Sequence, residues 1–363
     1  MLKQILEAFI PASGEYDIQK FGDGLINHTW KVTDKNNQPK YILQKVNIQV
    51  FKSPAQIAGN IKSLSNYLAK NHPDYLFVAP IATTNGDEIF KFSDEEYYRL
   101  FPYIAGSFTI NTVQTAAQAF EASRQFARFT HLLQDFNSAE LHYTLPGFHD
   151  LSTRFTQFQL ALKGADKSRL VTAGPEIDKA RNNRDVAKIY DDIVQHKLIP
   201  LRVIHHDTKI SNVLFDEHNK GLCVIDLDTV MPGYFISDVG DMMRTYLSPY
   251  SEEEKDLSKI EVRTNFFEGI VKGYFTEMES VLTKTEKSLF VYAGKFMIYM
   301  QAIRFLTDYL NNDTYYPTSY TGHNLVRAQN QFTLLEKYIE QENEFQKIVD
   351  QYIDNKVEIK PTL

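Results

Sequence analysis

Residues 202–228 read RVIHHDTKISNVLFDEHNKGLCVIDLD. The stretch contains two short apolar runs, separated by a turn at Asn219-Lys220-Gly221. Polar residues gather at the ends of these runs: His205, Asp207 and Asn212 before the first, and Asp226 and Asp228 after the second. Two apolar runs around such a turn predict a β-hairpin. The hairpin would bring Asp226 beside Asn212.

The spacing H-x-D-x-x-x-x-N suits phosphoryl transfer. Asp207 is placed to accept or orient the proton of an acceptor hydroxyl, and Asn212 offers an amide oxygen to Mg²⁺. Asp226 supplies the hard carboxylate oxygen that Mg²⁺ prefers. The alternative is that these residues only form turns. Lys209 either neutralises charge on the transferred phosphoryl group or is a solvent-facing loop lysine.

Composition excludes several classes of protein. The 363 residues carry a net charge of −7, so no basic field attracts nucleic acid or acidic membranes. The single cysteine, Cys223, excludes intrachain disulfides and fits a reducing compartment. The N-terminus has no uninterrupted apolar run, and the apolar stretch 289–303 is interrupted by Lys295 and too short for a bilayer. We expect a cytoplasmic protein with a small-molecule partner.

The first hundred residues alternate like strands. Strands are predicted at 29–32, 41–46 and 97–101, with a helix from about Pro54 to Lys70. Thr84-Asn85-Gly86-Asp87 predicts a hairpin between 81–82 and 88–92. These elements predict a small antiparallel sheet with one helix.

From residue 111 the apolar period changes from two to three and four, which indicates helices. Helices are predicted around 119–133, 186–193, 289–310 and 324–341, while 135–185 looks weakly patterned and polar. We therefore predict an N-terminal lobe at 1–104 and a mainly helical lobe at 105–363.

Two further features concern nucleotide phosphates. Gly22 and Gly24 fit a turn between antiparallel strands that covers phosphates, although they alone are a weak signal. Lys45, near the end of its strand, could reach the α and β phosphates. Gln44 points to the opposite face, so a register shifted by one residue would exchange the two roles.

The order of these parts resembles the aminoglycoside phosphotransferase and choline kinase family, and more closely its N-acetylhexosamine 1-kinases. The likeness covers nearly the whole chain. It rests on the following segments: 21–27, 41–47, 50–52, 99–101, 146–150, 206–209, 225–233, 238–241 and 304–310.

The resemblance implies a two-lobe, protein-kinase-like α+β fold with ATP and Mg²⁺ as cofactors. It implies Asp207 as the catalytic base and Asn212 and Asp226 as metal ligands; Lys209, taken from the residue pattern, is the second candidate catalytic residue. The nucleotide would be held by the following residues: Gly22, Gly24, Asn27, Lys45, Phe101, Tyr103 and Ile104. The sugar would contact Asp228, Arg304 and Asp308, while Asp238 and Asp241 would support the loops.

Two departures from the kinase pattern matter. The helix at 54–70 has no acidic residue, so the glutamate that usually pairs with the strand lysine has no counterpart there. No Ala-Pro-Glu segment follows Asp226, which argues against a protein substrate.

We therefore expect an ATP-dependent kinase of a sugar hydroxyl, most specifically O1 of N-acetylglucosamine or N-acetylgalactosamine. The alternatives are a kinase of another small alcohol or amine, such as choline, an aminoglycoside or a different sugar, and a non-catalytic nucleotide-binding scaffold.

Overall fold

The computed structural model describes residues 1–11, 13–22 and 26–354, which form two compact units. The first unit combines residues 1–109 with two later segments, 132–146 and 212–232. The second unit takes the rest of the chain. No change of periodicity in the sequence marks the two later segments of the first unit.

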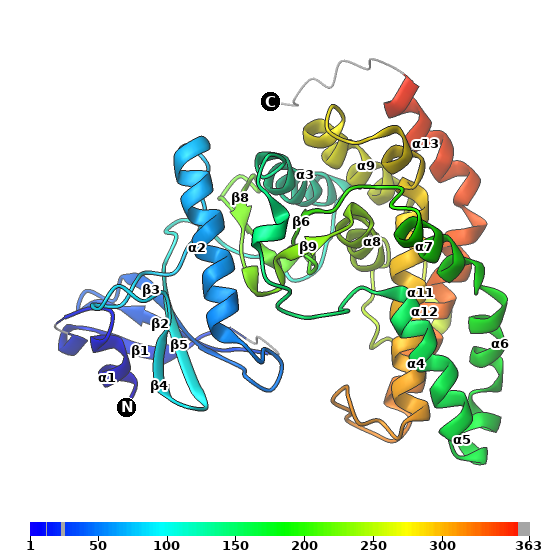
Figure 1. Ribbon diagram of the computed structural model, residues 1–363, viewed down its shortest axis with the longest axis horizontal. Helices are drawn as coiled ribbons and strands as arrows, with labels where there is room; N and C mark the ends of the chain where they lie inside the picture. Colours follow the sequence, from blue (N-terminus) through cyan, green and yellow to red (C-terminus); the bar gives the residue numbers. More distant parts are fainter. Residues whose placement is uncertain (12, 23–25, 355–363) are drawn as a thin grey trace. The chain divides into compact units, whose positions relative to one another are not determined.

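A five-stranded antiparallel sheet forms the frame of the first unit (Figure 1). Its strands, in the order β1-β2-β3-β5-β4, are β1 (Asp17–Lys20), β2 (His28–Thr33), β3 (Pro39–Val46), β4 (Phe90–Ser93) and β5 (Glu96–Pro102). Side chains alternate between the two faces of the sheet. One face, with Leu43 and Leu100, packs against Ile5 and Leu6 of α1 (Leu2–Glu7).

Helix α2 (Pro54–Asn71) has proline at its first position, where the missing N–H costs nothing. It buries Ile57, Ile61, Leu64 and Leu68, which recur at helical spacing. The predicted sheet with one long helix is thus confirmed, and the short helix α1 joins them.

The hairpin predicted around Asn85-Gly86 is wrong, although the turn itself exists. Gly86 N donates to Thr83 O at 2.9 Å. However, the two flanks of the turn pair elsewhere, since Ile81 bridges to Leu100 and β4 pairs with β5. A local turn signal cannot reveal which strand captures its flanks.

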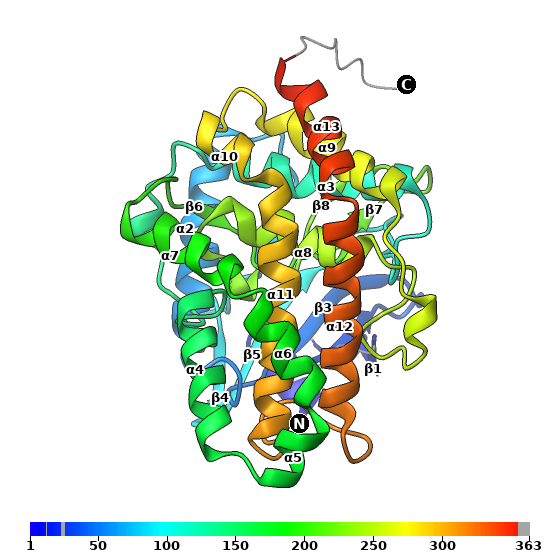
Figure 2. The same cartoon turned by 90° about the vertical axis from the view of Figure 1, so that its right-hand side faces the viewer.

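The second unit is built around helix α11 (Phe290–Leu310), which is apolar on nearly all sides. Helices α4 (Leu151–Gly164), α8 (Phe235–Tyr246) and α12 (His323–Glu340) pack against it (Figure 2). Gly240 lets α8 approach α11, because a Cβ there would lie 2.3 Å from Ala293 O. A helix that is buried all round belongs in a core.

The remaining elements complete the chain. The other helices are α3 (Ala116–Leu132), α5 (Lys167–Thr172), α6 (Gly174–Asn182), α7 (Asp185–Gln195), α9 (Thr264–Met278), α10 (Lys284–Ser288) and α13 (Glu342–Asp354). The short strands are β6 (Arg202–Ile204), β7 (Val213–Phe215), β8 (Gly221–Val224) and β9 (Met231–Gly233). Residues Ile210–Asn212 and Leu227–Thr229 form single 3₁₀ turns, η3 and η4.

The predicted helices α3, α7, α11 and α12 are confirmed. Helices α4, α5 and α6 lie in the stretch 135–185, where no pattern was recognised. Helix α4 begins at Asp150, whose side chain accepts a hydrogen bond from Thr153 N, and it buries only Leu151, Phe158 and Ala161. Among the described residues, we find no helix with the length and apolar character that crossing a bilayer requires.

Candidate active site

The β7–β8 hairpin carries the two predicted metal ligands. Val213 pairs with Val224, and Ile225 N donates to Asn212 O at 2.8 Å. Asp216 stabilises the turn by accepting from the backbone of His218 and Lys220, both at 2.9 Å. The predicted hairpin is therefore confirmed, and it places Asn212 and Asp226 together at its open end.

A cavity of about 260 Å³ lies within the first unit, and Asn212 and Asp226 contribute to its wall. Its apolar lining includes Ile42, Val78, Phe101, Leu214 and Ile225. A pocket that is mostly apolar with a few polar groups at one place is typical of a small-molecule or cofactor site. The lining also includes Tyr103 and Ile104, so three of the residues predicted to hold the nucleotide, with Phe101, border this one cavity.

A buried ion pair connects the sheet to the segment after the hairpin, and its arginine, Arg99, lines the cavity. Both terminal nitrogens of Arg99 bond to the Asp228 carboxylate, and Nη2 lies 2.9 Å from Oδ2. Arg99 is 3% exposed and Asp228 1% exposed. Gln44 Oε1 accepts from Arg99 Nη2 at 2.9 Å, and Asn27 Nδ2 donates to Asp228 Oδ2 at 2.8 Å. The arginine and the carboxylate are thus fully enclosed by hydrogen bonds.

This pairing corrects the role given to Asp228. Its two oxygens accept from Arg99 and Asn27, and its side chain has almost no exposed surface. An acceptor sugar would have to displace a buried cation to reach it, which is unfavourable. Asp228 therefore holds η4, and with it the neighbouring Asp226, against the sheet.

The register question at Gln44 and Lys45 has a clear answer. Gln44 lines the cavity and Lys45 does not. Lys45 points to the opposite face, where its ammonium pairs with Glu96 and lies 5.9 Å from the centroid of the Tyr98 ring. Glu96, which pairs with Lys45, lies on β5 and not on α2. The expectation that Lys45 reaches nucleotide phosphates is therefore not supported by its position.

The phosphate-covering turn is described only in part. Gly22 has a left-handed backbone with φ of 73°, which favours glycine. Gly24 lies outside the described residues. Asn27 follows this turn, and its side chain joins two segments: Oδ1 accepts from Asn47 N at 3.0 Å and Nδ2 donates to Asp228.

In the second unit, two carboxylates of α8 hold the loop that carries Asp207. Asp238 accepts from the backbone N–H groups of His205 at 3.0 Å and His206 at 2.7 Å. Asp241 accepts from Thr208 N at 2.8 Å. The predicted supporting roles of Asp238 and Asp241 are confirmed by these bonds. Since the donors lie on both sides of Asp207 in the sequence, the loop backbone around it is fixed.

Burial dominates the electrostatics of this support. It raises the pKa of Asp238 to about 7, against the effect of the two backbone donors, which lower it. Burial also raises the pKa of Asp241, although Arg244 beside it acts in the opposite direction. His205 is fully buried, and its ring packs edge-on to Phe126 at 5.1 Å, which confirms its structural role beneath the loop.

Asp207 itself is partly exposed, as a group that meets a substrate has to be. Its Oδ2 lies 2.9 Å from the ammonium of Lys209, and the Lys209 side chain is 47% exposed. The lysine is therefore an ion-pair partner of the predicted base, and its two interpretations, phosphate contact and solvent-facing residue, both stay open.

Arg304 lies in an aromatic environment that leads toward the Asp207 loop. Its guanidinium carbon is 5.3 Å from the Phe148 ring centroid and 5.6 Å from that of Tyr316. Phe148 stacks on His149 at 4.3 Å, and His149 lies 5.4 Å from the ring of His206, the residue before Asp207. Arg304 thus belongs to a continuous group of side chains that ends beside the predicted base.

Asp308 has a different position from the one expected. It is 4% exposed and accepts from the backbone N–H groups of Thr314, Tyr315 and Tyr316 at 2.8–2.9 Å, as well as from Asn324. These bonds hold the loop that presents Tyr316 to Arg304. Asp308 is therefore a positioning residue, and the structure gives no reason to place it against a sugar.

Sequence reasoning missed Arg99 as a site residue. The alternation of side chains along a strand could have identified it, because Arg99 lies two residues before Phe101 and so shares its face of the sheet. Arg99 is also directly opposite Gln44 in the β3–β5 register. Phe148 and Tyr316 were also missed, and their loops carry no pattern that would have placed them near Arg304.

Comparison with known proteins adds independent information. The model of the phosphotransferase enzyme family matches residues 17–280, well over half of the 363-residue chain. The chain belongs to the phosphotransferase enzyme family. Its sheet-containing unit and its helical unit have the protein-kinase-like fold of that family, so the predicted fold class is confirmed.

Solved structures with this fold are distant in sequence. An aminoglycoside phosphotransferase from Alicyclobacillus acidocaldarius is 14% identical with a TM-score of 0.62, covering 94% of this chain and 97% of that one. A microcompartment-associated aminopropanol kinase is 15% identical with a TM-score of 0.64 and the same coverage. A spectinomycin phosphotransferase in complex with ADP and spectinomycin is 12% identical, covering 95% and 98%, with a TM-score of 0.55. At such identities these likenesses establish the fold alone.

The donor set of this phosphotransferase-family chain fits a magnesium ion that is shared with phosphates. Asn212 and Asp226 both line the cavity, and they offer one amide and one carboxylate oxygen. Mg²⁺ is usually bound by one or two protein oxygens plus substrate phosphates, rather than by a complete protein cage.

Proposed function

We propose that the protein is an ATP-dependent kinase of a small neutral acceptor, with O1 of an N-acetylhexosamine as the acceptor group. The observation that carries the proposal is the hairpin, which brings Asn212 and Asp226 into the wall of one mostly apolar cavity. Membership in the phosphotransferase enzyme family supports the reaction type.

The nucleotide would occupy the cavity of the first unit. Its base would pack against Ile42, Phe101 and Ile225, where apolar surface replaces water. Asn212 and Asp226 would hold Mg²⁺ beside the phosphates; the ion supplies charge neutralisation during transfer. The spectinomycin phosphotransferase with this fold was crystallised with ADP, which supports a nucleotide as the ligand.

Asp207 would orient the acceptor hydroxyl and take its proton. In the balanced reaction the acceptor oxygen bonds to the γ-phosphorus, and the bond from that phosphorus to the bridging oxygen of ADP breaks. The backbone hydrogen bonds to Asp238 and Asp241 fix the loop around Asp207, so little reorganisation is needed during transfer.

The charges near Asp207 favour a neutral acceptor over an ammonium compound. Burial lowers the pKa of His149 well below its usual range, and the charges of His206, Arg304, Arg244 and Arg154 act in the same direction. Of these charges, that of Arg244 is balanced by Asp241 and Glu252. Arg304 and Arg154 would disfavour a choline or aminoglycoside cation beside His149, whereas a neutral sugar would not be disfavoured. The aromatic rings of Phe148 and Tyr316 offer flat surfaces for a pyranose. Because the positively charged Arg304 lies beside both rings, they are a poor place for a second cation.

The test is ADP release with a panel of acceptors: N-acetylglucosamine, N-acetylgalactosamine, glucose, choline, ethanolamine and an aminoglycoside. We expect release with the N-acetylhexosamines, and loss of the signal when O1 is blocked as a methyl glycoside. Release with choline or ethanolamine alone would refute the acceptor assignment but leave the kinase assignment intact.

The variant Asp207→Asn should abolish turnover while ATP binding is kept, because the change removes the proton acceptor and preserves the shape. Asp178→Asn, at an exposed position in the same unit, is the matched control and should have normal activity. Substantial turnover by Asp207→Asn would contradict the role of Asp207. ATP binding without turnover on any acceptor in the wild type would favour the non-catalytic scaffold.

A further inference from the structure

Tyr246, the last residue of α8, is a fully buried side chain to which the proposed reaction gives no role. Its hydroxyl donates a hydrogen bond to Thr208 O, the carbonyl oxygen of the residue that follows Asp207. The two residues are 38 positions apart in the sequence. The contact therefore connects the end of a core helix to the loop that carries the predicted base.

The Thr208 carbonyl needs such a donor. Thr208 is fully buried, and a buried backbone C=O that lies in an irregular loop has no ladder to supply its hydrogen bond. Asp238 and Asp241 hold the loop by accepting from its N–H groups, but a carbonyl has to be held by a donor. The phenol of Tyr246 is a donor and complements the two carboxylates.

The loop also contains a strained residue directly before Asp207. His206 has a φ of 65°, in the left-handed region that residues with a side chain rarely adopt. Such a conformation persists only where the surrounding contacts hold it. Loss of one contact would let the loop relax toward an ordinary conformation, and the Asp207 carboxylate would move with it.

The phenol keeps its donor proton. Burial raises the pKa of Tyr246 well above its usual value, and the nearby carboxylates of Asp241, Asp207 and Asp238 act in the same direction. The hydroxyl therefore stays protonated at any pH at which the protein is folded and active. The contact with Thr208 O does not depend on a titration.

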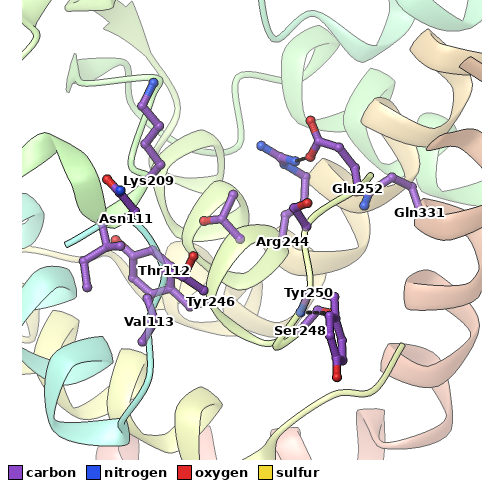
Figure 3. Close-up of a pocket in the computed structure, with 13 residues that line it drawn as sticks. Asn111, Thr112, Val113, Lys209, Arg244, Tyr246, Ser248, Tyr250, Glu252 and Gln331 are labelled. Atoms are coloured by element: carbon purple, nitrogen blue, oxygen red, sulfur yellow. Dashed lines mark hydrogen bonds and ion pairs between the residues drawn. The ribbon is translucent and has the colours of Figure 1, made fainter. Parts of the chain in front are cut away.

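The same end of α8 is itself held in place. Figure 3 shows Arg244 and Tyr246 together with Lys209 of the loop around one cavity, and the ion pair of Arg244 with Glu252. Arg244 Nη2 also donates to Asp241 Oδ1 at 3.0 Å. The groups that hold the Asp207 loop thus come from a braced helix.

We infer that Tyr246 is a positioning residue for the proposed phosphoryl transfer. Its hydroxyl fixes the peptide after Asp207 and thereby aligns the Asp207 carboxylate with the acceptor hydroxyl. Tyr246 touches neither substrate, and no proton or phosphoryl group passes through it. The inference rests on the proposed role of Asp207, so its test includes a measurement that needs no activity.

The variant Tyr246→Phe removes the hydroxyl and keeps the ring. We expect kcat with an N-acetylhexosamine to fall at least about tenfold, since a misplacement of about 1 Å at a reacting group costs about 100-fold. The KM for ATP should change less than about twofold, because ATP binding does not depend on the alignment of Asp207.

The matched control is Tyr299→Phe. Tyr299 is also fully buried in the second unit, and its hydroxyl donates to a backbone carbonyl, Ala180 O, at 2.7 Å. Both variants lose one buried hydroxyl–carbonyl hydrogen bond, so their melting temperatures should fall by similar amounts. Only Tyr246→Phe should lose kcat.

Hydrogen exchange followed by mass spectrometry tests the positioning directly, without ATP or acceptor. The peptides to follow contain residues 205–212. Their exchange should become at least about tenfold faster in Tyr246→Phe, because the loop opens more often, and should be unchanged in Tyr299→Phe. If the wild type transferred phosphate to no acceptor, the proposed function would fail, and this exchange would still decide whether Tyr246 holds the loop.

Three results would overturn the inference. One is a Tyr246→Phe variant with the kcat of the wild type. Another is an equal loss of kcat in Tyr246→Phe and Tyr299→Phe, which would show a general effect of lost stability. The third is unchanged exchange of the loop in Tyr246→Phe, because the hydroxyl would then not be holding it.

Discussion

The buried pair Arg99–Asp228 offers the sharpest test of how the first unit is held together. The variant Arg99→Met keeps the length of the side chain and leaves the Asp228 carboxylate enclosed, with Asn27 as its remaining side-chain donor. Removing one partner of a buried ion pair costs about 3–5 kcal/mol, because an uncompensated charge stays buried. Since Asp228 is only 1% exposed, water cannot replace the lost cation, and we expect the full cost.

Urea unfolding followed by tryptophan fluorescence measures this loss of stability in the sheet that contains Arg99. Trp30 is the only tryptophan of the chain and lies on β2, in the same sheet as Arg99. The control is Lys40→Met, which removes an exposed pair with Asp34 in the same sheet and should cost less than about 1 kcal/mol.

A double-mutant cycle separates the pair from its surroundings. Asp228→Asn alone should also destabilise, since it leaves the guanidinium buried against Gln44. The double variant Arg99→Met/Asp228→Asn should lose at least about 2 kcal/mol less than the sum of the single losses, because neither charge is then left alone. Additive losses, or a loss below about 1 kcal/mol for Arg99→Met, would refute the reasoning.

Three other predictions follow from the same structure. Lys45→Met should change the KM for ATP less than about threefold, because Lys45 does not line the cavity, whereas Gln44→Leu should raise KM severalfold because Gln44 does. Steady-state kinetics compares the two variants, and the reverse order would contradict the register. Burial raises the pKa of Asp238 to about 7, so the folded state binds its proton more tightly than the unfolded chain does. Its contribution to stability is therefore present at low pH and is lost as pH rises from about 4 to 7, by at most about 1.4 kcal/mol per pH unit. Asp238→Asn should remove this pH dependence of the free energy of unfolding, measured with urea. An unchanged pH dependence in the variant would show that Asp238 is not its source. Gly240→Ala should lower the free energy of thermal unfolding by about 1–3 kcal/mol, because its Cβ would lie 2.3 Å from a backbone oxygen of α11. An unchanged free energy of unfolding would show that α8 and α11 can move apart.

Local patterns predicted much of this molecule. The hairpin after Asn212 needed only two apolar runs and a turn, and α11 needed only its long apolar repeat, so both were visible in the sequence. The loop supports Asp238 and Asp241 were expected from likeness, and hydrogen bonds to the loop backbone now account for them.

Long-range partners could not be predicted in the same way. Whether Gln44 or Lys45 faces the cavity depends on the sheet register, and a shift of one residue exchanges every side chain between the faces. Asp228 and Asp308 were expected to meet a substrate because of the family resemblance. Asp228 is buried by Arg99, which lies far away in the sequence, and Asp308 by the irregular loop that follows its helix and by Asn324. No local pattern reveals either set of partners.

The assembly of the first unit from three separate segments has a consequence for synthesis in the cell. A ribosome that has released only residues 1–109 has delivered every strand of the sheet, but not Asp228, the partner of Arg99. The nascent sheet would then contain an arginine without its counter-ion, and the cavity would lack the lining residues that come from the later segment: Asn212, Leu214, Ile225, Asp226 and Leu227. Stable folding of this unit is therefore expected only after residue 232 has emerged. Until then, a chaperone that shields the open face would serve the growing chain.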